Sequence, residues 1–242
     1  MIRLVERDSV ALLEEYCAGD PFGCRIVAAE RTYGTSESFA QFFLQYNDSN
    51  EIVAAIGRLD NGMTVCTRGG SDDEEIDAFV EMCVGKTGAV RPVRDGELAT
   101  GAVMQLDRSL LPDSTTDFEL QPAVEDVYTV LESCPGLGFE VPPFKEFYSD
   151  IRKRLRVGTA SCALVRSGVM PASCAAVHIM DDVSLLTMCA THPKHRGKGY
   201  AAGAIHALAE RRRMDKFFVM CLPGMADYYK KLGFAVIGGF RY

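Results

Sequence analysis

The sequence lacks a long apolar segment and paired cysteine motifs, and each absence excludes a class of protein. No apolar run approaches the roughly 20 residues of a membrane-spanning helix, and no charged start precedes an apolar leader. The nine cysteines lie scattered in apolar segments, as at Cys66, Cys83 and Cys221, without a C-x-x-C pair. We therefore expect reduced cysteines in a cytoplasmic protein, with no zinc site, no metal and no membrane partner.

Positive charge is also scarce. The 242 residues contain 26 lysines and arginines against 33 aspartates and glutamates, a net charge of −7, so general nucleic-acid binding is not expected. Hydrophobic residues make up 48% of the chain, enough for one large core or two ordinary ones.

The most informative segment is a basic, glycine-containing loop that joins a strand to a helix. An apolar run at 184–191 leads into Arg196-Gly-Lys-Gly199, and a run of small residues follows. Glycines at 197 and 199 let consecutive backbone N–H groups converge, and the helix start adds its unpaired donors and dipole. This pattern predicts a pyrophosphate site. Taken alone, the segment is also compatible with a plain strand-to-helix turn, but it fits neither a P-loop nor a dinucleotide fingerprint.

A second motif follows about thirty residues later, at Asp227 to Phe234. Between the two motifs, 216–222 is a short apolar run bounded by Lys216 and by Pro223-Gly224, which predicts a buried strand. The order Arg196-x-x-Gly199-x-Ala201, then Tyr229-x-x-x-Gly233-Phe234, resembles the GNAT superfamily of N-acetyltransferases.

This resemblance implies acetyl-CoA as cosubstrate, with no metal. It implies backbone contacts to the pantetheine arm at Cys189, Ala190 and Thr191, and phosphate contacts at Arg196, Gly197, Lys198, Gly199, Tyr200 and Ala201. Tyr229 matches the tyrosine that protonates the departing CoA thiolate, and its neighbour Tyr228 is easily confused with it. Leu222 stands where the family often has an asparagine that contacts CoA.

The base that would deprotonate the amine is not evident from the sequence. The strand at 184–191 carries no carboxylate, and His178 is the candidate on the preceding strand, although a histidine in the core or on the surface is the simpler interpretation. His192 and His195 have the spacing of a metal pair but lack a third ligand.

The resemblance therefore implies an acyl-CoA-dependent N-acyltransferase, transferring acetyl directly to the amine of a small molecule or peptide. A CoA-binding or sensing module without turnover is the main alternative, and a nucleotide-binding protein is a third. The acceptor is not identifiable, and a homodimer remains open.

We expect a mixed, mostly antiparallel sheet flanked by helices, arranged as two tandem GNAT-like domains, 1–115 and 116–242. The break falls in the turn-rich segment 107–122. The C-terminal domain should contain helices at 123–133 and after Pro142-Pro143, and a loop at 134–138 should join them. Its predicted strands lie at 159–165, 173–179, 183–191, 216–222 and 234–242. The cations at 152–156 are interpreted as favourable charge at a helix C-terminus.

The N-terminal half repeats the order of elements without the phosphate loop. A helix is expected at 8–17, a second helix after the acidic start at 72–75, and strands at 25–29, 39–46, 51–59, 63–67 and 89–93. Because four consecutive carboxylates at 72–75 repel phosphate and suit the helix's own N-terminus, this copy is not expected to bind CoA. Gly85-Lys86-Thr87 is rejected as a P-loop, since it follows a helix.

Overall fold

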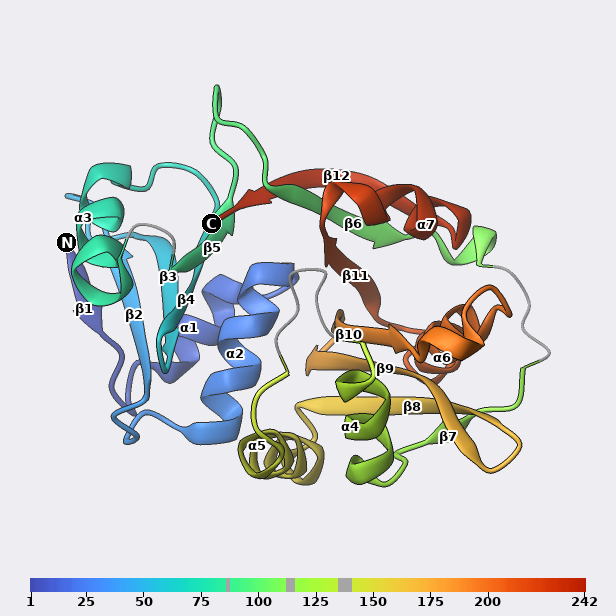
Figure 1. Cartoon of the computed structure of the whole chain (residues 1–242). Coiled ribbons are helices and arrows are strands. Elements are labelled where there is room, and N and C mark those ends of the chain that lie inside the picture. Colours follow the sequence, from blue (N-terminus) through green and yellow to red (C-terminus); the bar gives the residue numbers. More distant parts are fainter. Residues whose placement is uncertain (86–87, 112–115, 135–140) are drawn as a thin grey trace. The chain divides into compact units, whose positions relative to one another are not determined.

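The computed structural model describes residues 1–85, 88–111, 116–134 and 141–242. Parts of three segments discussed above lie outside the described residues: 86–87 of the rejected P-loop, 112–115 of the expected break, and 135–138 of the expected loop. The architecture is a mixed α/β fold in which mostly antiparallel strands are flanked by helices (Figure 1). The predicted fold class is therefore confirmed.

The chain forms two compact units, and neither is continuous in sequence. Unit 1 contains Met1–Gln105, Phe218–Asp227 and Val236–Tyr242, and unit 2 contains Leu106–Phe217 and Tyr228–Ala235. The division into domains 1–115 and 116–242 stays a prediction.

Unit 1 contains β1 to β5 and most of β6, β11 and β12, and these strands pair in the order β1-β2-β3-β4-β5-β12-β6-β11. Strands β1 to β4 are antiparallel, β5 joins β4 in parallel, and β11 and β12 pair antiparallel with β6 and β5. The bounds are β1 Ile2–Leu4, β2 Ala40–Tyr46, β3 Ile52–Leu59, β4 Gly62–Thr67, β5 Ala89–Pro92, β6 Gly101–Leu106, β11 Lys216–Cys221 and β12 Phe234–Arg241. The predicted hairpin at 60–62 is present, with Leu59 opposite Gly62.

The helices of unit 1 are α1 (Val10–Cys17), α2 (Pro21–Tyr33) and α3 (Asp73–Val84). The strand predicted at 25–29 is wrong, because these residues lie inside α2. Asp20 caps this helix: its Oδ1 accepts the backbone N–H of Phe22 at 2.7 Å and of Gly23 at 3.0 Å. Pro21 occupies the first turn, where its missing N–H costs nothing.

The acidic residues at 72–75 cap the N-terminus of helix α3 and lie in its first turn, as the sequence predicts. Asp72 is its N-cap and accepts the Glu75 N–H at 3.0 Å, while the carboxylates of Asp73, Glu74 and Glu75 lie in the first turn, where they favour the positive end of the dipole. The helix packs on β3 and β4 through a buried cluster formed by Ala54, Ile56, Met63, Val65, Ile76, Val80 and Ala89.

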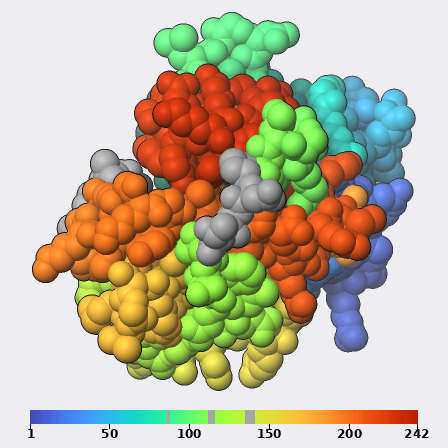
Figure 2. All heavy atoms as spheres, turned by 90° about the vertical axis from the view of Figure 1, so that its right-hand side faces the viewer, coloured from blue at the N-terminus to red at the C-terminus, as the bar shows by residue number. Residues whose placement is uncertain are grey.

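Unit 2 contains the predicted antiparallel meander, preceded by the short strand β7, in the order β10-β9-β8-β7. The strands are β7 Glu119–Leu120, β8 Ala160–Ser167, β9 Met170–Met180 and β10 Val183–Thr191. Gly168 and Asp181 turn the chain between strands with φ angles of 63° and 47°. The residues of β7 and α4, in yellow-green, lie beside the gold β8–β9 hairpin in Figure 2.

The helices of unit 2 are α4 Val124–Glu132, α5 Phe144–Val157, α6 Tyr200–Arg211 and most of α7 Ala226–Lys231, whose first two residues belong to unit 1. Helices α4 and α5 pack on β8 and β9 through Val127, Leu131, Phe147, Ile151 and Cys174. Helix α6 contacts β8, β9 and β10. Three short 3-10 helices, η1 (Arg108–Leu110), η2 (Pro193–His195) and η3 (Pro223–Met225), complete the described elements.

Candidate functional site

The loop between β10 and α6 requires both of its glycines. Gly197 and Gly199 have φ angles of 76° and 79°, a region that residues with a Cβ rarely adopt. Gly199 is the N-cap of α6, and no side chain among the described residues caps the helix. The first-turn N–H groups of α6 therefore lack a side-chain acceptor, which is the local requirement for an anion site.

Cations surround this helix start. Arg196 and Lys198 lie in the exposed loop, and Lys194 is exposed just before it. Partial desolvation, Lys198, His192 and Lys194 together lower the pKa of His195 below its ordinary value. Desolvation is the largest cause of the lowered pKa, and the neighbouring positive charges lower it further.

The end of β10 is held by side chains from neighbouring elements. The Thr191 carbonyl accepts hydrogen bonds from Arg196 Nε at 3.2 Å and Cys134 Sγ at 3.3 Å. Ser173 Oγ of β9 donates to the Ala190 carbonyl at 2.8 Å and lies 2.9 Å from Thr191 Oγ1. These contacts fix the strand that leads into the loop, and no spacing pattern in the sequence would have revealed Cys134 or Ser173.

Strand β10 is also irregular. Its register with β9 shifts between Leu186 and Met188, and the hydroxyl of the intervening Thr187 reaches the Ala176 carbonyl at 3.3 Å. Such a bulge changes the direction of a strand. The half-buried residues Cys189 and Ala190 follow it directly.

The two tyrosines of α7 differ in their surroundings. Tyr229 is buried, 6% exposed, and its ring packs against Phe234 at 5.5 Å between centroids. The Tyr228 hydroxyl is buried and has no hydrogen-bond partner among the described residues. Burial, with a smaller effect of the Cys189 thiol, raises the pKa of Tyr228. The structure thus brings Tyr228 near the strand that precedes the loop.

Close packing explains why the second motif has a glycine at position 233. Gly233 has a φ of 89°, and a Cβ there would lie 2.9 Å from the Leu110 carbonyl carbon and 3.0 Å from the Asp107 carbonyl oxygen. The Asp107 N–H donates to the Gly233 carbonyl at 2.9 Å. The chain can therefore pass from α7 into β12 beside η1 only with glycine at this position.

His178 lies on β9, opposite Leu185 of β10 and Ala160 of β8. Because Leu185 precedes Thr191 by six residues on β10, His178 is about 20 Å from the loop end of the strand, measured along it. Its predicted role as a base stays a prediction.

The corresponding segment of the N-terminal half is built differently. Arg68 donates to the Ala18 carbonyl at 2.5 Å, and its guanidinium lies 5.3 Å from the centre of the Tyr16 ring. The acidic first turn of α3 follows it. Arg68 is therefore engaged within its own unit, and the helix start carries its own negative charge.

No group of three or more metal-binding side chains occurs among the described residues. The rings of His192 and His195 lie 5.5 Å apart, but the His192 Nδ1 accepts the Lys194 N–H at 3.2 Å. Nor is any helix in the described ranges both long and apolar enough to span a bilayer.

This strand, glycine loop and helix lie within a recognisable family segment. Residues 124–234 match the model of the acetyltransferase (GNAT) family, and this part of the chain is a GNAT domain. The match includes β10, the glycine loop, α6 and both α7 tyrosines.

Solved structures show the same fold over the whole chain. A tandem GNAT protein from the clavulanic acid biosynthesis pathway superposes with a TM-score of 0.58 at 12% identity, covering 100% of this chain and 96% of that one. A GNAT-family acetyltransferase from Colwellia psychrerythraea gives 0.60 at 13% identity, with 99% and 97% covered. A GCN5-related N-acetyltransferase from Sphaerobacter thermophilus gives 0.60 at 11% identity, with 100% and 93% covered. No curated protein matches the sequence.

Proposed function

We propose that this protein is an N-acetyltransferase that transfers acetyl from acetyl-CoA to the amine of a small molecule or peptide. One observation carries the proposal: two left-handed glycines and an uncapped helix start follow a strand inside a GNAT domain. Such a start favours a pyrophosphate ligand.

In this proposal the backbone amides from Gly197 to Ala201 bind the CoA pyrophosphate, and Arg196 and Lys198 add charge. Arg196 is already oriented by its hydrogen bond to the Thr191 carbonyl. The main chain at Cys189 to Thr191 would pair with the pantetheine arm as an added strand does.

The chemistry is direct transfer. The amine nitrogen bonds to the thioester carbonyl carbon, the C–S bond breaks, and the sulfur leaves as a thiolate that takes up a proton. A backbone N–H at the end of β10 would stabilise the oxyanion. Tyr229 is the proposed acid because of its place in the motif, and Tyr228 competes for this role because its hydroxyl is buried without a partner among the described residues. We leave the base open, with His178 as its candidate.

Binding is tested by titrating acetyl-CoA calorimetrically into Arg196→Ala and Gly199→Asp variants. Loss of the arginine charge should weaken affinity about tenfold, and Gly199→Asp should weaken it more, through backbone strain and an added negative charge. Arg213→Ala is the matched control, because Arg213 is exposed outside the loop. Unchanged affinity in both loop variants would exclude the assignment.

The acid is tested with Tyr228→Phe and Tyr229→Phe in single-turnover acetyl transfer. The variant that removes the acid should lose on the order of 100-fold in rate with little change in acetyl-CoA affinity. If neither rate falls, no α7 tyrosine protonates the thiolate.

A CoA-binding module without turnover is the second candidate. It is favoured by the absence of a carboxylate along β10 and by the packing of the Tyr229 ring against Phe234. Measuring the release of free CoA from acetyl-CoA in the presence of a panel of amines distinguishes the enzyme from the binding module. Tight acetyl-CoA binding with no amine-dependent release would favour the module.

A further inference from the structure

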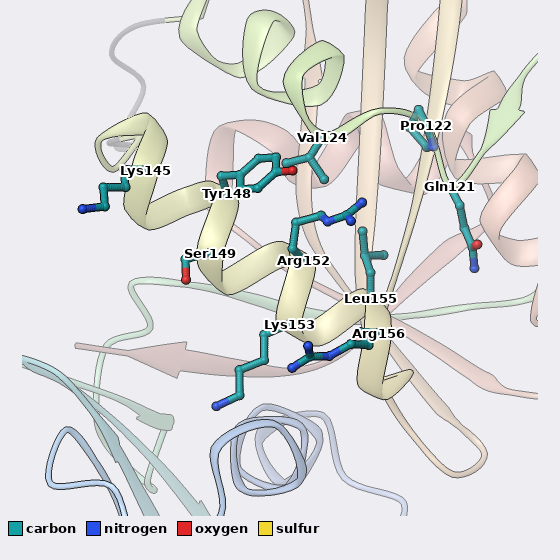
Figure 3. A pocket seen from close by; sticks show the side chains of 10 residues that line it. All are labelled: Gln121, Pro122, Val124, Lys145, Tyr148, Ser149, Arg152, Lys153, Leu155 and Arg156. Carbon is teal, nitrogen blue, oxygen red and sulfur yellow. The ribbon is translucent and has the colours of Figure 1, made fainter.

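A cavity of about 700 Å³ opens on the exposed side of α5 within unit 2, and we call it the α5 cavity. Figure 3 shows its ten lining side chains, which come from α5 and from the segment that enters α4. Four of them are cationic and none is acidic: the cations are Lys145, Arg152, Lys153 and Arg156. In a chain with a net charge of −7, this is a local concentration of positive charge.

Helical spacing places these residues along one face. Lys145, Arg152 and Arg156 are separated by seven and four residues, so they follow one another along the helix. The opposite face carries Phe147 and Ile151, which are buried in the core of unit 2. The cations therefore line the cavity while the helix itself is anchored.

Charge at the helix C-terminus does not explain the arrangement. It accounts for Arg154 and Arg156 in the last turn, and Arg154 is buried and paired with Asp150 at 2.8 Å. Lys145 lies in the first turn, where a cation opposes the helix dipole. Helix stability therefore does not account for Lys145 among the cations that line the cavity.

Partners for these charges are few in the described part of the chain. Lys145, Arg152 and Arg156 form no ion pair with any described residue, and the Arg152 guanidinium lies over the Tyr148 ring at 5.8 Å. Stacking on an aromatic ring orients a guanidinium while leaving its N–H donors available to an acceptor.

The remaining lining residues define the shape of the ligand. Pro122 and Val124 are buried, and Leu155 and Tyr148 are half-buried, so the cavity has an apolar floor beneath a cationic rim. Its volume lies in the usual range of small-molecule sites, about 300–1,000 Å³. A flat protein surface would not supply such a concave, partly apolar site.

We infer that the α5 cavity binds a small organic anion with at least two negative charges, carried by carboxylate or phosphate groups on a compact apolar body. None of the residues of the acyl-CoA loop lines the cavity. The inference is therefore independent of the proposed acetyl transfer, and it holds even if that proposal fails.

The experiment compares binding of citrate and of phenyl phosphate to the full chain in low-salt buffer, each with and without saturating acetyl-CoA. The test variant is Arg152→Gln with Arg156→Gln. The matched control is Arg211→Gln with Arg213→Gln, which removes two exposed charges outside the cavity. Thermal unfolding of both double variants verifies that they fold.

We expect at least one probe to bind with a dissociation constant below about 1 mM, and the test variant to weaken it at least tenfold while the control changes it less than twofold. Acetyl-CoA should not compete. Tighter binding of citrate would indicate that the natural ligand is a polycarboxylate. Tighter binding of phenyl phosphate would indicate that it is a phosphate ester. Equal losses in the two double variants, full competition by acetyl-CoA, or no binding of either probe would overturn the inference.

Discussion

Single residues set the electrostatics of the glycine loop. Gly197 and Gly199 make the backbone conformation possible. Desolvation lowers the pKa of His195, and the positive potential of Lys198, His192 and Lys194 lowers it further. Binding of a pyrophosphate would offset that potential. His195 therefore offers a direct readout of an anion in the loop.

We predict that acetyl-CoA raises the pKa of His195. Because the bound state would then hold more protons than the free state, affinity should increase as the pH falls through the pKa of His195 in the bound state and level off below its pKa in the free protein. The measurement is acetyl-CoA affinity between about pH 8 and pH 5, with the imidazole of His195 followed by NMR. His195→Gln should flatten the pH dependence, and an equally steep profile in that variant would contradict the prediction.

The sequence predicts those site residues whose role depends on their immediate neighbours in the chain, through a required backbone conformation or a nearby charge. Gly199 and Arg196 stand in a motif a few residues long, whereas Cys134 and Ser173 reach the end of β10 from other elements. Tyr228 and Tyr229 are adjacent in sequence, but they pack differently. The Tyr229 ring is buried against Phe234, whereas the buried Tyr228 hydroxyl has no hydrogen-bond partner in the described part of the chain. Such differences depend on tertiary contacts, which one sequence does not encode locally.

At the level of elements, α2 shows where the periodicity argument fails. The apolar run that includes Ile26 and Val27 has strand-forming residues, but both are buried in a helix. Burial on most sides of α2 removes the amphipathic pattern. The decisive local signal was Asp20-Pro21, a cap followed by a first-turn proline.

We predict that Asp20→Ala destabilises the protein by about 1 kcal/mol, because two backbone N–H groups lose their acceptor. Asp20→Asn should recover most of the loss, since its amide oxygen can accept the same bonds. Asp48→Ala, at an exposed turn position, is the control. Chemical denaturation measures the free energy of unfolding of the three variants, each compared with the unchanged protein. A loss in Asp20→Ala no larger than in Asp48→Ala would contradict the role of the cap.

At the scale of the whole molecule, the sequence predicts which segments are helices and strands better than it predicts which strands pair with one another. The meander and its turns are predictable because each pair of strands is joined by a short turn. The partners of the last two strands are not predictable in this way. Strands β11 and β12 pair with β6 and β5, which lie more than 100 residues earlier in the chain. No turn specifies such a pairing.

These distant pairings make the independence of the N-terminal domain testable. Residues 1–115 alone lack the segments Phe218–Asp227 and Val236–Tyr242, which belong to the first compact unit. We predict that the 1–115 fragment unfolds without a cooperative transition, because β5 and β6 would be left with unpaired edges. Amide hydrogen exchange should show β6 unprotected in the fragment and protected in the full chain. A peptide of residues 216–242 added in trans should restore protection in proportion to its concentration. A sharp transition and full β6 protection in the fragment alone would instead show that residues 1–115 fold on their own.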